Sequence, residues 1–374
     1  MQVAPHPGVP LRILLVGPAM DIVGGQAIQA NALLEGFKGE PECEIAFAPT
    51  NPPLPKLLSR VKYVRTLLRF LIFLPMLFLR LKRCDVLHIF TPAYTAFFVW
   101  TVPAMAVGRI LKKKVVLHYH DGRGYTHVAE SPLAVRCMSA AHVVVTPSDY
   151  LVDAFARHNV SAISIPNVLD TSHLRFRTRN PLRPVFLTNR GLEPLYNVAC
   201  VVRAFAAIQQ QYPEARLVVA HDGPCRGELE ELARTLNLAN VVFAGTVSQK
   251  RMAELYDAAD IFMMSPDIDN MPGTVLECYA AGLPVVSTNA GGIPYIVKNE
   301  WTGLLVNCGD SNALAAAACR LLRDPAYARE LARRGYNECA QYSWKSVGPR
   351  WISLYSELTG IPAPEKKRAV AVGA

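Results

Sequence analysis

The stretch DIDNMPGTVLECYAAGLPVVS, residues 267–287, has the pattern of a loop, a helix and a strand. An apolar run, ADIFMMS, comes directly before its acidic loop, and Gly273 and Thr274 stand where the helix is expected to begin. Apolar strands that alternate with helices predict a parallel sheet buried on both faces. Since ligands of such sheets bind beyond the carboxyl ends of the strands, the loop before the helix is a candidate binding segment.

The same alternation of apolar runs and helical patterns continues through most of the chain. Between residues 166 and 184 this alternation is interrupted by a segment rich in Pro, Asn and Arg, a composition typical of a linker between domains. We therefore expect two α/β domains, at 1–168 and 169–345, with a helix at 346–360 that rejoins the first domain and a disordered tail at 361–374. The apolar runs are RILLVG, EIAFA, DVLHIF, KVVLHY, HVVVTP, AISIP, VFLTN, ARLVVAHDG, NVVFAG, ADIFMMS, LPVVST and TGLLVN.

Composition restricts the compartment and the partners of the chain. Nine cysteines are scattered with no CxxC pair, which indicates neither a zinc site nor a disulfide framework and fits a reducing cytosol. The N-terminal residues lack the pattern of a signal peptide, so we expect a cytoplasmic protein. The net charge of +9 is concentrated, because between Glu44 and Asp85 there are eight basic residues and no acidic one.

Two common nucleotide-binding motifs are absent from the sequence. The first apolar run is followed by neither GxGxxG nor GxxxxGK[ST], which disfavours a dinucleotide oxidoreductase and a P-loop phosphoryl transferase. A Gly24–Gly25 pair opens the first helical pattern. Free backbone N–H groups there would favour an anion, although a glycine pair also serves as a tight turn.

The stretch at 267–287 carries the stronger chemical signal. Gly273 lets a ligand approach the backbone, the helix N-terminus favours a diphosphate, and Glu277 can accept two hydrogen bonds from a vicinal diol. A nucleotide sugar has all three features. The alternative is structural: Asp269 and Glu277 favour the positive end of the helix dipole, and Gly273 forms a turn.

The order of these motifs resembles that of the retaining glycosyltransferases of family 4. There a carboxylate pair eight positions apart frames a glycine-containing loop and precedes a small-residue helix, as DNMPGTVLECYAAGLPVV does from Asp269 to Val286. The resemblance implies an α/β fold of the GT-B type, with two Rossmann-like parallel-sheet domains that face a central cleft. Further segments in the family's order are VVLHYHDG, IPNVLD, NRGLEPLYN, HDGPCRGELEELA and AELYDAADIFMMSP.

The resemblance also implies roles for individual residues. Glu277 would bind the ribose diol of the donor, Arg190 would neutralise the leaving diphosphate, and His120 would contact the transferred sugar, with His118 as its rival. Gly24 and Gly25 would lie under the diphosphate. The sugar hydroxyls would be held by Asp269 and by the backbone of Met271, Pro272, Gly273 and Thr274. The implied reaction transfers a sugar with retention of configuration and uses a nucleotide-diphosphate sugar as co-substrate, without a metal ion or other cofactor.

The chain departs from the family pattern in two places. Family members place a Lys a few residues after the Arg that matches Arg190, and here Leu195, Tyr196 and Asn197 follow instead. Asp269 replaces the usual Glu and is one methylene shorter. The triplet DID at 267–269 is the one candidate for a metal-binding DxD motif, but its place in the sugar loop argues against that interpretation.

Residues 56–84 predict a contact with an anionic membrane surface. Basic residues flank an uncharged core at 70–79 that is too short to span a bilayer, as in a helix that lies at the cytoplasmic face of a membrane. A lipid-linked or glycan acceptor follows from this hypothesis. The alternative is a crossover helix that packs on the sheet with its cations extended into solvent. Nucleic acid is not expected, because no motif for it is present.

Other functions of the same fold stay open at this stage. A nucleotide-sugar epimerase would need no acceptor, and a glycan phosphorylase would need phosphate. A degenerate subunit that binds a nucleotide sugar without turnover would explain the missing Lys and the shortened Asp269.

Overall fold

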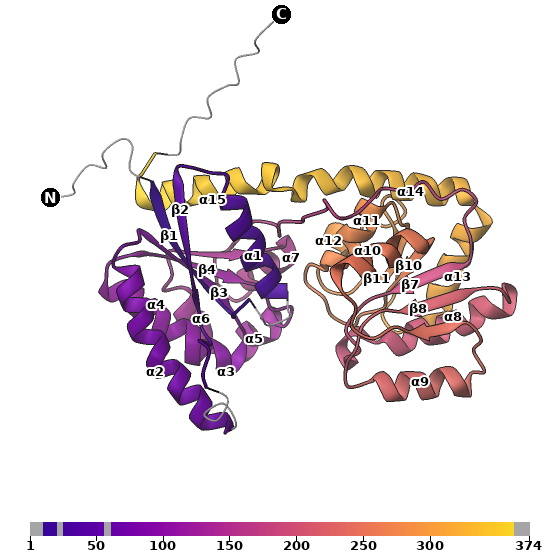
Figure 1. Ribbon diagram of the computed structural model, residues 1–374, viewed down its shortest axis with the longest axis horizontal. Coiled ribbons are helices and arrows are strands. Elements are labelled where there is room, and N and C mark those ends of the chain that lie inside the picture. The colour runs from indigo at the N-terminus through magenta and orange to yellow at the C-terminus, as the bar shows by residue number, and fades with distance from the viewer. Residues whose placement is uncertain (1–9, 21–24, 56–60, 363–374) are drawn as a thin grey trace, which may run out of the picture. The chain divides into compact units, whose positions relative to one another are not determined.

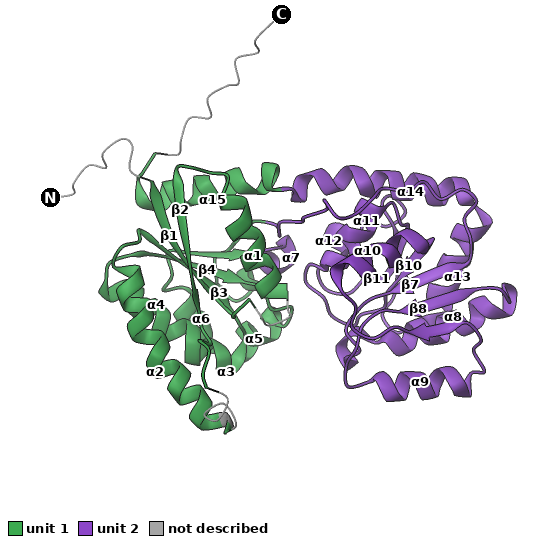
Figure 2. Ribbon diagram, viewed as in Figure 1, with its two compact units in different colours: residues 1–146, 155–165, 344–374 green, residues 147–154, 166–343 purple. Residues whose placement is uncertain are grey.

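The computed structural model describes residues 10–20, 25–55 and 61–362, without the side chain of Lys62. The predictions for Gly24 and for the basic residues Lys56 and Arg60 lie outside the described residues, as does nearly all of the predicted tail. The chain divides into two compact units (Figure 2). Unit 1 comprises residues 1–146, 155–165 and 344–374, and unit 2 comprises residues 147–154 and 166–343.

Unit 1 is built on a sheet of six parallel strands in the order β2-β1-β3-β4-β5-β6 (Figure 1). The central strand β3 is completely buried and β4 is buried after its first residue, since helices connect successive strands and cover the sheet. The first two strands are in register, with Ile13 opposite Ile45. The strands are β1 (Leu11–Gly17), β2 (Cys43–Pro49), β3 (Val86–Thr91), β4 (Lys114–Tyr119), β5 (Val143–Thr146) and β6 (Ile163–Ser164).

The helices of unit 1 include the last helix of the chain, α15. Its Trp351 and Tyr355 are buried, and Trp344 at its start donates a hydrogen bond from Nε1 to Glu40 Oε1 (3.1 Å). Helix α2 packs against α4, and α1 packs against α15. The helices are α1 (Gly25–Phe37), α2 (Lys62–Leu81), α3 (Tyr94–Ala96), the π-helix η1 (Phe97–Thr101), α4 (Val102–Ile110), α5 (Gly124–Glu130), α6 (Pro132–Met138) and α15 (Trp344–Thr359). Helix α7 (Asp149–Ala156) belongs to unit 2 except for its last two residues.

Unit 2 has a second parallel sheet, in the order β12-β11-β10-β7-β8-β9. The order places β7 and β10 side by side at the centre, so the loops that follow them meet at one edge of the sheet. The strands are β7 (Val185–Thr188), β8 (Arg216–Val219), β9 (Val241–Phe243), β10 (Ile261–Met263), β11 (Val285–Thr288) and β12 (Leu304–Val306). The helices are η2 (Pro194–Tyr196), α8 (Val198–Gln211), α9 (Arg226–Thr235), α10 (Gln249–Ala258), α11 (Gly273–Ala281), α12 (Ile293–Ile296), α13 (Ser311–Arg323), α14 (Pro325–Glu338) and η3 (Cys339–Tyr342).

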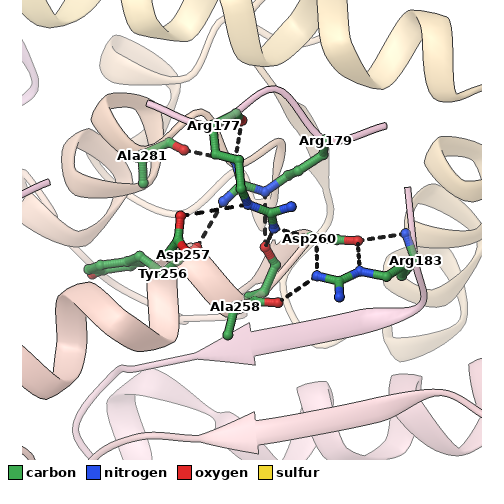
Figure 3. A network of polar contacts seen from close by, with 9 residues as sticks. Arg177, Arg179, Arg183, Tyr256, Asp257, Ala258, Asp260 and Ala281 are labelled. Carbon is green, nitrogen blue, oxygen red and sulfur yellow. Dashed lines mark hydrogen bonds and ion pairs between the residues drawn. The ribbon is translucent and has the colours of Figure 1, made fainter. Parts of the chain in front are cut away.

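The segment predicted as a linker contains three arginines that fix it to unit 2 (Figure 3). Arg179 is completely buried and donates hydrogen bonds to the carbonyl oxygens of Tyr256, Ala259 and Ala281, at 2.7–2.9 Å. These carbonyls lie at the C-terminal ends of α10 and α11, where helices lack internal donors and favour a cation. Arg177 and Arg183 both form ion pairs with the buried Asp260.

Substitution of Arg179 by Met is expected to lower the free energy of unfolding by about 3 kcal/mol or more. The side chain keeps its length, but the helix-end carbonyls lose charged donors inside the protein. Chemical denaturation measures the change. Arg175, an exposed residue of the same segment, provides the matched control, because Arg175→Met removes the same charge without these bonds. Equal stability of the two variants would contradict this role.

Candidate active site

The N-terminus of α11 carries most of the predicted donor-binding residues. Pro272 has extended backbone geometry and precedes the helix, which begins at Gly273. A side chain at Gly273 would meet no atom within 4 Å, so the start of the helix is open. Met271 is buried, and its Sδ accepts a hydrogen bond from the backbone N–H of Asn167. The exposed backbone N–H groups of this turn can therefore bind an anion.

Glu277 lies one turn into α11 and is held by a tyrosine. Its Oε2 accepts a hydrogen bond from Tyr256 Oη (2.5 Å), which itself accepts one from Asn189 Nδ2 (2.6 Å). Burial, together with the Glu277 charge, raises the pKa of Tyr256 well above its usual value, so the phenol stays a donor. Glu277 Oε1 has no partner among the described residues. One carboxylate oxygen is thus fixed, while the other can accept a ligand hydroxyl.

Arg190 and Asp269, both predicted from the sequence, form an ion pair. Arg190 Nη2 lies 2.5 Å from Asp269 Oδ2, and the two side chains are 13% and 10% exposed. The ring of Tyr196 stacks on the guanidinium at 4.2 Å. Burial raises the pKa of Asp269, although the Arg190 charge opposes this shift. Only one arm of the guanidinium is engaged, and its Nε is buried without a partner in the described chain.

Tyr196 and Asn197 occupy the place of the Lys that the family pattern would predict. Tyr196 supports Arg190, and Asn197, in the left-handed region with φ of 42°, donates a hydrogen bond to Asp267 Oδ1 (3.1 Å). The two carboxylates of the DID triplet therefore have different partners, since Asp269 binds Arg190. Within the residues that the structure describes, no three His, Cys, Asp or Glu side chains gather as metal ligands.

A second glycine pair, Gly291–Gly292, supports the loop that holds Asp269. The backbone N–H of Gly292 donates to the carbonyl of Asp269 (2.8 Å), and a Cβ on Gly292 would lie 1.9 Å from Asn270 O. Gly291 has φ of +51°, and its Cβ would clash with the Asp269 carbonyl in the same way. We did not identify this pair from the sequence. The signal is a GG that comes two residues after the apolar run LPVVST.

Several buried polar atoms around this region have no protein partner within the described residues. They come from the carboxyl end of β7 and from the loop and first turn of α11, the two segments that carry Arg190 and Glu277. Buried polar groups in folded proteins are nearly always hydrogen-bonded, so a cluster of unsatisfied ones indicates a polar ligand. The atoms are Thr188 Oγ1, Asn189 Oδ1, Arg190 Nε, Asn270 Nδ2 and Thr274 Oγ1.

The remaining predicted residues belong to unit 1. Gly25 is exposed at the start of α1, after β1. His120 follows β4, and its ring lies 4.1 Å from that of His118 by centroid distance. His118 Nδ1 hydrogen-bonds His88 Nε2 (3.0 Å), and His88 Nδ1 bonds Tyr355 Oη (2.6 Å). His118 is therefore packed and hydrogen-bonded through Nδ1, while the Nε2 atoms of both His118 and His120 are buried without a partner in the described structure.

The buried histidines predict an acid-sensitive stability. Burial, with the neighbouring His120, lowers the pKa of His88 to about 3 and that of His118 well below its usual value. Histidine in the unfolded chain titrates near pH 6.5, so below that pH the unfolded state binds more protons than the folded state. The free energy of unfolding should fall by up to ~1.4 kcal/mol per pH unit per histidine as pH decreases from about 6.5 toward 3.

Urea denaturation between about pH 7 and 5 measures this dependence. His88→Gln removes one titrating group and should reduce the slope, while His158→Gln, in which a surface histidine is replaced, should not. Equal slopes in the wild type and in His88→Gln would contradict the burial of a neutral His88.

Comparison with known proteins identifies a family to which most of unit 2 is similar. Residues 172–338 match the family described as glycosyl transferases group 1. The chain is also 30% identical over 265 residues to a GDP-mannose-dependent alpha-(1-6)-phosphatidylinositol monomannoside mannosyltransferase of Mycobacterium tuberculosis, covering 64% of this chain and 66% of that protein. The chain belongs to the group 1 glycosyl transferases.

Other similarities of this group 1 glycosyl transferase show its fold and how much of each relative the chain covers. It is 31% identical over 144 residues to the sulfoquinovosyl transferase SQD2 of Arabidopsis thaliana, covering 38% of this chain and 28% of that protein. The matches thus span from about a quarter to about two-thirds of these relatives. The structure of Anabaena Alr3699/HepE in complex with UDP superposes with a TM-score of 0.72 at 16% identity, covering 93% of this chain and 100% of that one. This likeness confirms the predicted GT-B fold.

Proposed function

We propose that this group 1 glycosyl transferase moves a sugar from a nucleotide-diphosphate donor to a hydroxyl of a lipid-linked or glycan acceptor, with retention of anomeric configuration. The observation that carries the proposal is the arrangement in unit 2. The open N-terminus of α11, the free oxygen of Glu277 and the partly engaged Arg190 match the diphosphate and ribose of such a donor.

The leaving diphosphate gains negative charge as the glycosidic bond breaks. In our proposal the α11 N–H groups and the Arg190 guanidinium stabilise that charge without a metal ion, because both are fixed before the reaction. Arg190 would exchange part of its contact with Asp269 for the phosphate, and Asp269 would then be available to a sugar hydroxyl. His120 would contact the transferred sugar from unit 1.

The names of similar proteins support these substrates. The mycobacterial relative is named for a GDP-mannose donor and a phosphatidylinositol acceptor, and the Anabaena structure contains UDP. We infer from the first that a lipid acceptor is compatible with this family. The base and the sugar of the donor used by this chain are to be determined by the experiment below.

Helix α2 supports a role for the membrane surface in acceptor binding. Tyr63, Leu67 and Leu71 on one side of it are 81%, 59% and 57% exposed, whereas Phe73 and Leu77 on the other side are buried against unit 1. Arg65 and Arg69 lie on another face of the helix, where their exposed apolar neighbour is Ile72. A helix with exposed apolar residues and nearby cations can bind an anionic membrane surface. Helix α2 also packs on unit 1, as the alternative interpretation of a crossover helix expects. No helix among the described residues is long and apolar enough to cross a membrane.

The double substitution Leu67→Glu and Leu71→Glu is expected to abolish recovery with anionic liposomes in a flotation assay, because it places two acids on the proposed contact surface. Leu133→Glu, at an equally exposed leucine of α6, is the matched control and should float as the wild type does. Equal recovery of the wild type with anionic and neutral liposomes, or no recovery with either, would contradict peripheral attachment at the cytoplasmic membrane face.

Product analysis tests the activity itself. The protein is incubated with UDP-, GDP- and ADP-sugars labelled at C1, with and without a membrane lipid extract, and the products are identified by NMR. We expect a new glycoside with the anomeric configuration of the donor, formed only when acceptor is present. A changed sugar without acceptor would indicate an epimerase, a sugar phosphate formed only when inorganic phosphate is added would indicate a phosphorylase, and nucleotide binding without product would indicate a degenerate subunit.

A further inference from the structure

A cavity of about 310 Å³ lies at the carboxyl end of the unit 1 sheet, beside helix α2. Thr50 and Asn51, which follow β2, form part of its wall, and the rings of Phe90 and Trp100 form another part. Its volume is at the lower end of the range for small-molecule sites. The cavity therefore has space for a small polar group between hydroxyl, amide and aromatic side chains.

Two arginines of α2 give the cavity a positive charge. Arg65 and Arg69 both line it, and they lie one helical turn apart, so they share one face of the helix. Neither side chain has a hydrogen-bond or ion-pair partner within residues 10–20, 25–55 and 61–362, and Arg69 Nε is buried without one. No lining residue that the structure describes is acidic. Paired guanidinium groups without a counter-ion are an arrangement that binds phosphate groups.

The surroundings of the cavity indicate what carries the phosphate. Ile72 of α2 is exposed and lies three positions after Arg69 and seven after Arg65, so it shares their side of the helix, whereas Leu67 and Leu71 are exposed on another face. On the inner side, the ring centroid of Phe90 lies 5.0 Å from that of His120. A bound anion would thus have the exposed Ile72 on one side and, behind Phe90, the predicted sugar-contacting histidine on the other.

We propose that this cavity binds the phosphate or diphosphate group of a lipid-linked acceptor. Arg65 and Arg69 would bind the phosphate oxygens, and the lipid chain would lie along the exposed apolar face of α2. The inference rests on the proposed glycosyltransferase function and specifies the chemical class of its acceptor. It assigns acceptor phosphate to unit 1, separate from the donor diphosphate that Arg190 and α11 would bind in unit 2.

Calorimetric titration of the full-length protein with farnesyl diphosphate tests the assignment. Farnesol and inorganic pyrophosphate serve as probes for the lipid and the phosphate alone. We expect Arg65→Gln and Arg69→Gln each to weaken binding of farnesyl diphosphate about 10-fold or more, because each removes a charge-assisted contact. Arg69→Lys should retain part of the affinity. Arg83→Gln, at an exposed arginine just after α2, is the matched control and should leave the Kd unchanged.

Each other outcome would overturn a stated part of the proposal. Unchanged binding in the Arg65→Gln, Arg69→Gln double variant, or equal binding of farnesol, would exclude phosphate recognition here. Equal binding of inorganic pyrophosphate would exclude the lipid and leave a soluble phosphorylated acceptor. Loss of binding in Glu277→Gln would place the probe in the donor site. Nucleotide binding is measured in the same variants, so failure of the donor site is distinguished from failure of this cavity.

Discussion

Substitution of Glu277 by Gln is expected to weaken binding of the donor's nucleoside diphosphate by about 10- to 100-fold. A carboxylate accepts hydrogen bonds from both hydroxyls of a ribose diol, and each bond to a charged group contributes about 1.5–3 kcal/mol. In the free protein Tyr256 holds only one of its oxygens, so the other is ready for the ligand. The amide keeps the shape of the side chain but replaces one acceptor by a donor and removes the charge.

Isothermal titration with UDP, GDP and ADP measures the change. Glu228→Gln, in which an exposed acid of α9 in the same unit is replaced, is the matched control. Melting temperatures of the free proteins should be similar, because Tyr256 can still donate to an amide oxygen. If both variants bind the nucleotide as the wild type does, Glu277 has no ribose role, and the structural interpretation of this acid is favoured.

Substitution of Arg190 by Gln is expected to lower kcat by about 100- to 1,000-fold, the range found when one donor to a developing negative charge is removed. The effect should be large because this chain lacks the Lys that the family pattern places a few residues after this Arg. Tyr196 stacks on the guanidinium and Asn197 binds Asp267. Both side chains are uncharged, so neither supplies a second positive charge. Steady-state rates with the natural donor, or with the sugar nucleotide that shows turnover, measure the loss.

A second variant separates catalysis from stability in this experiment. Arg190→Gln leaves the buried Asp269 without its cation, which by itself should destabilise the fold. The double variant Arg190→Gln, Asp269→Asn removes both charges and should recover stability, but not turnover. If recovery of stability also restored kcat, Arg190 would act only by holding the loop, and its proposed contact with the leaving group would be wrong.

The two sheets could be predicted from the sequence because parallel strands are buried on both faces and appear as continuous apolar runs. RILLVG became β1 and KVVLHY became β4, with limits that differ by at most one residue. The order of the strands could not be predicted in this way, because it depends on pairings between distant segments. The linker prediction also missed that this segment is fixed to unit 2, since Arg179 binds carbonyls that lie 77–102 residues away in the chain.

The candidate site was predictable where its residues are contiguous. The loop and helix at 267–277 predicted Gly273 at the helix start and Glu277 on the first turn, and in the structure α11 begins at Gly273 with Glu277 four residues later. Contacts between distant segments were missed, namely the pairing of Arg190 with Asp269, the hydrogen bond from Tyr256 to Glu277, and the support of the loop by Gly291–Gly292. Each of these contacts joins residues that are distant in the sequence, and no repeating pattern of residues indicates that they meet. The roles given to these residues stay predictions until a ligand is bound.

A crystal structure of the protein with the nucleoside diphosphate that binds it most tightly would test the central claim most directly. We predict that both ribose hydroxyls lie within hydrogen-bond distance of the Glu277 carboxylate, and that the terminal phosphate contacts the α11 N-terminus and the Arg190 guanidinium. A nucleotide bound elsewhere, or one whose diphosphate leaves Arg190 paired only with Asp269, would contradict the account.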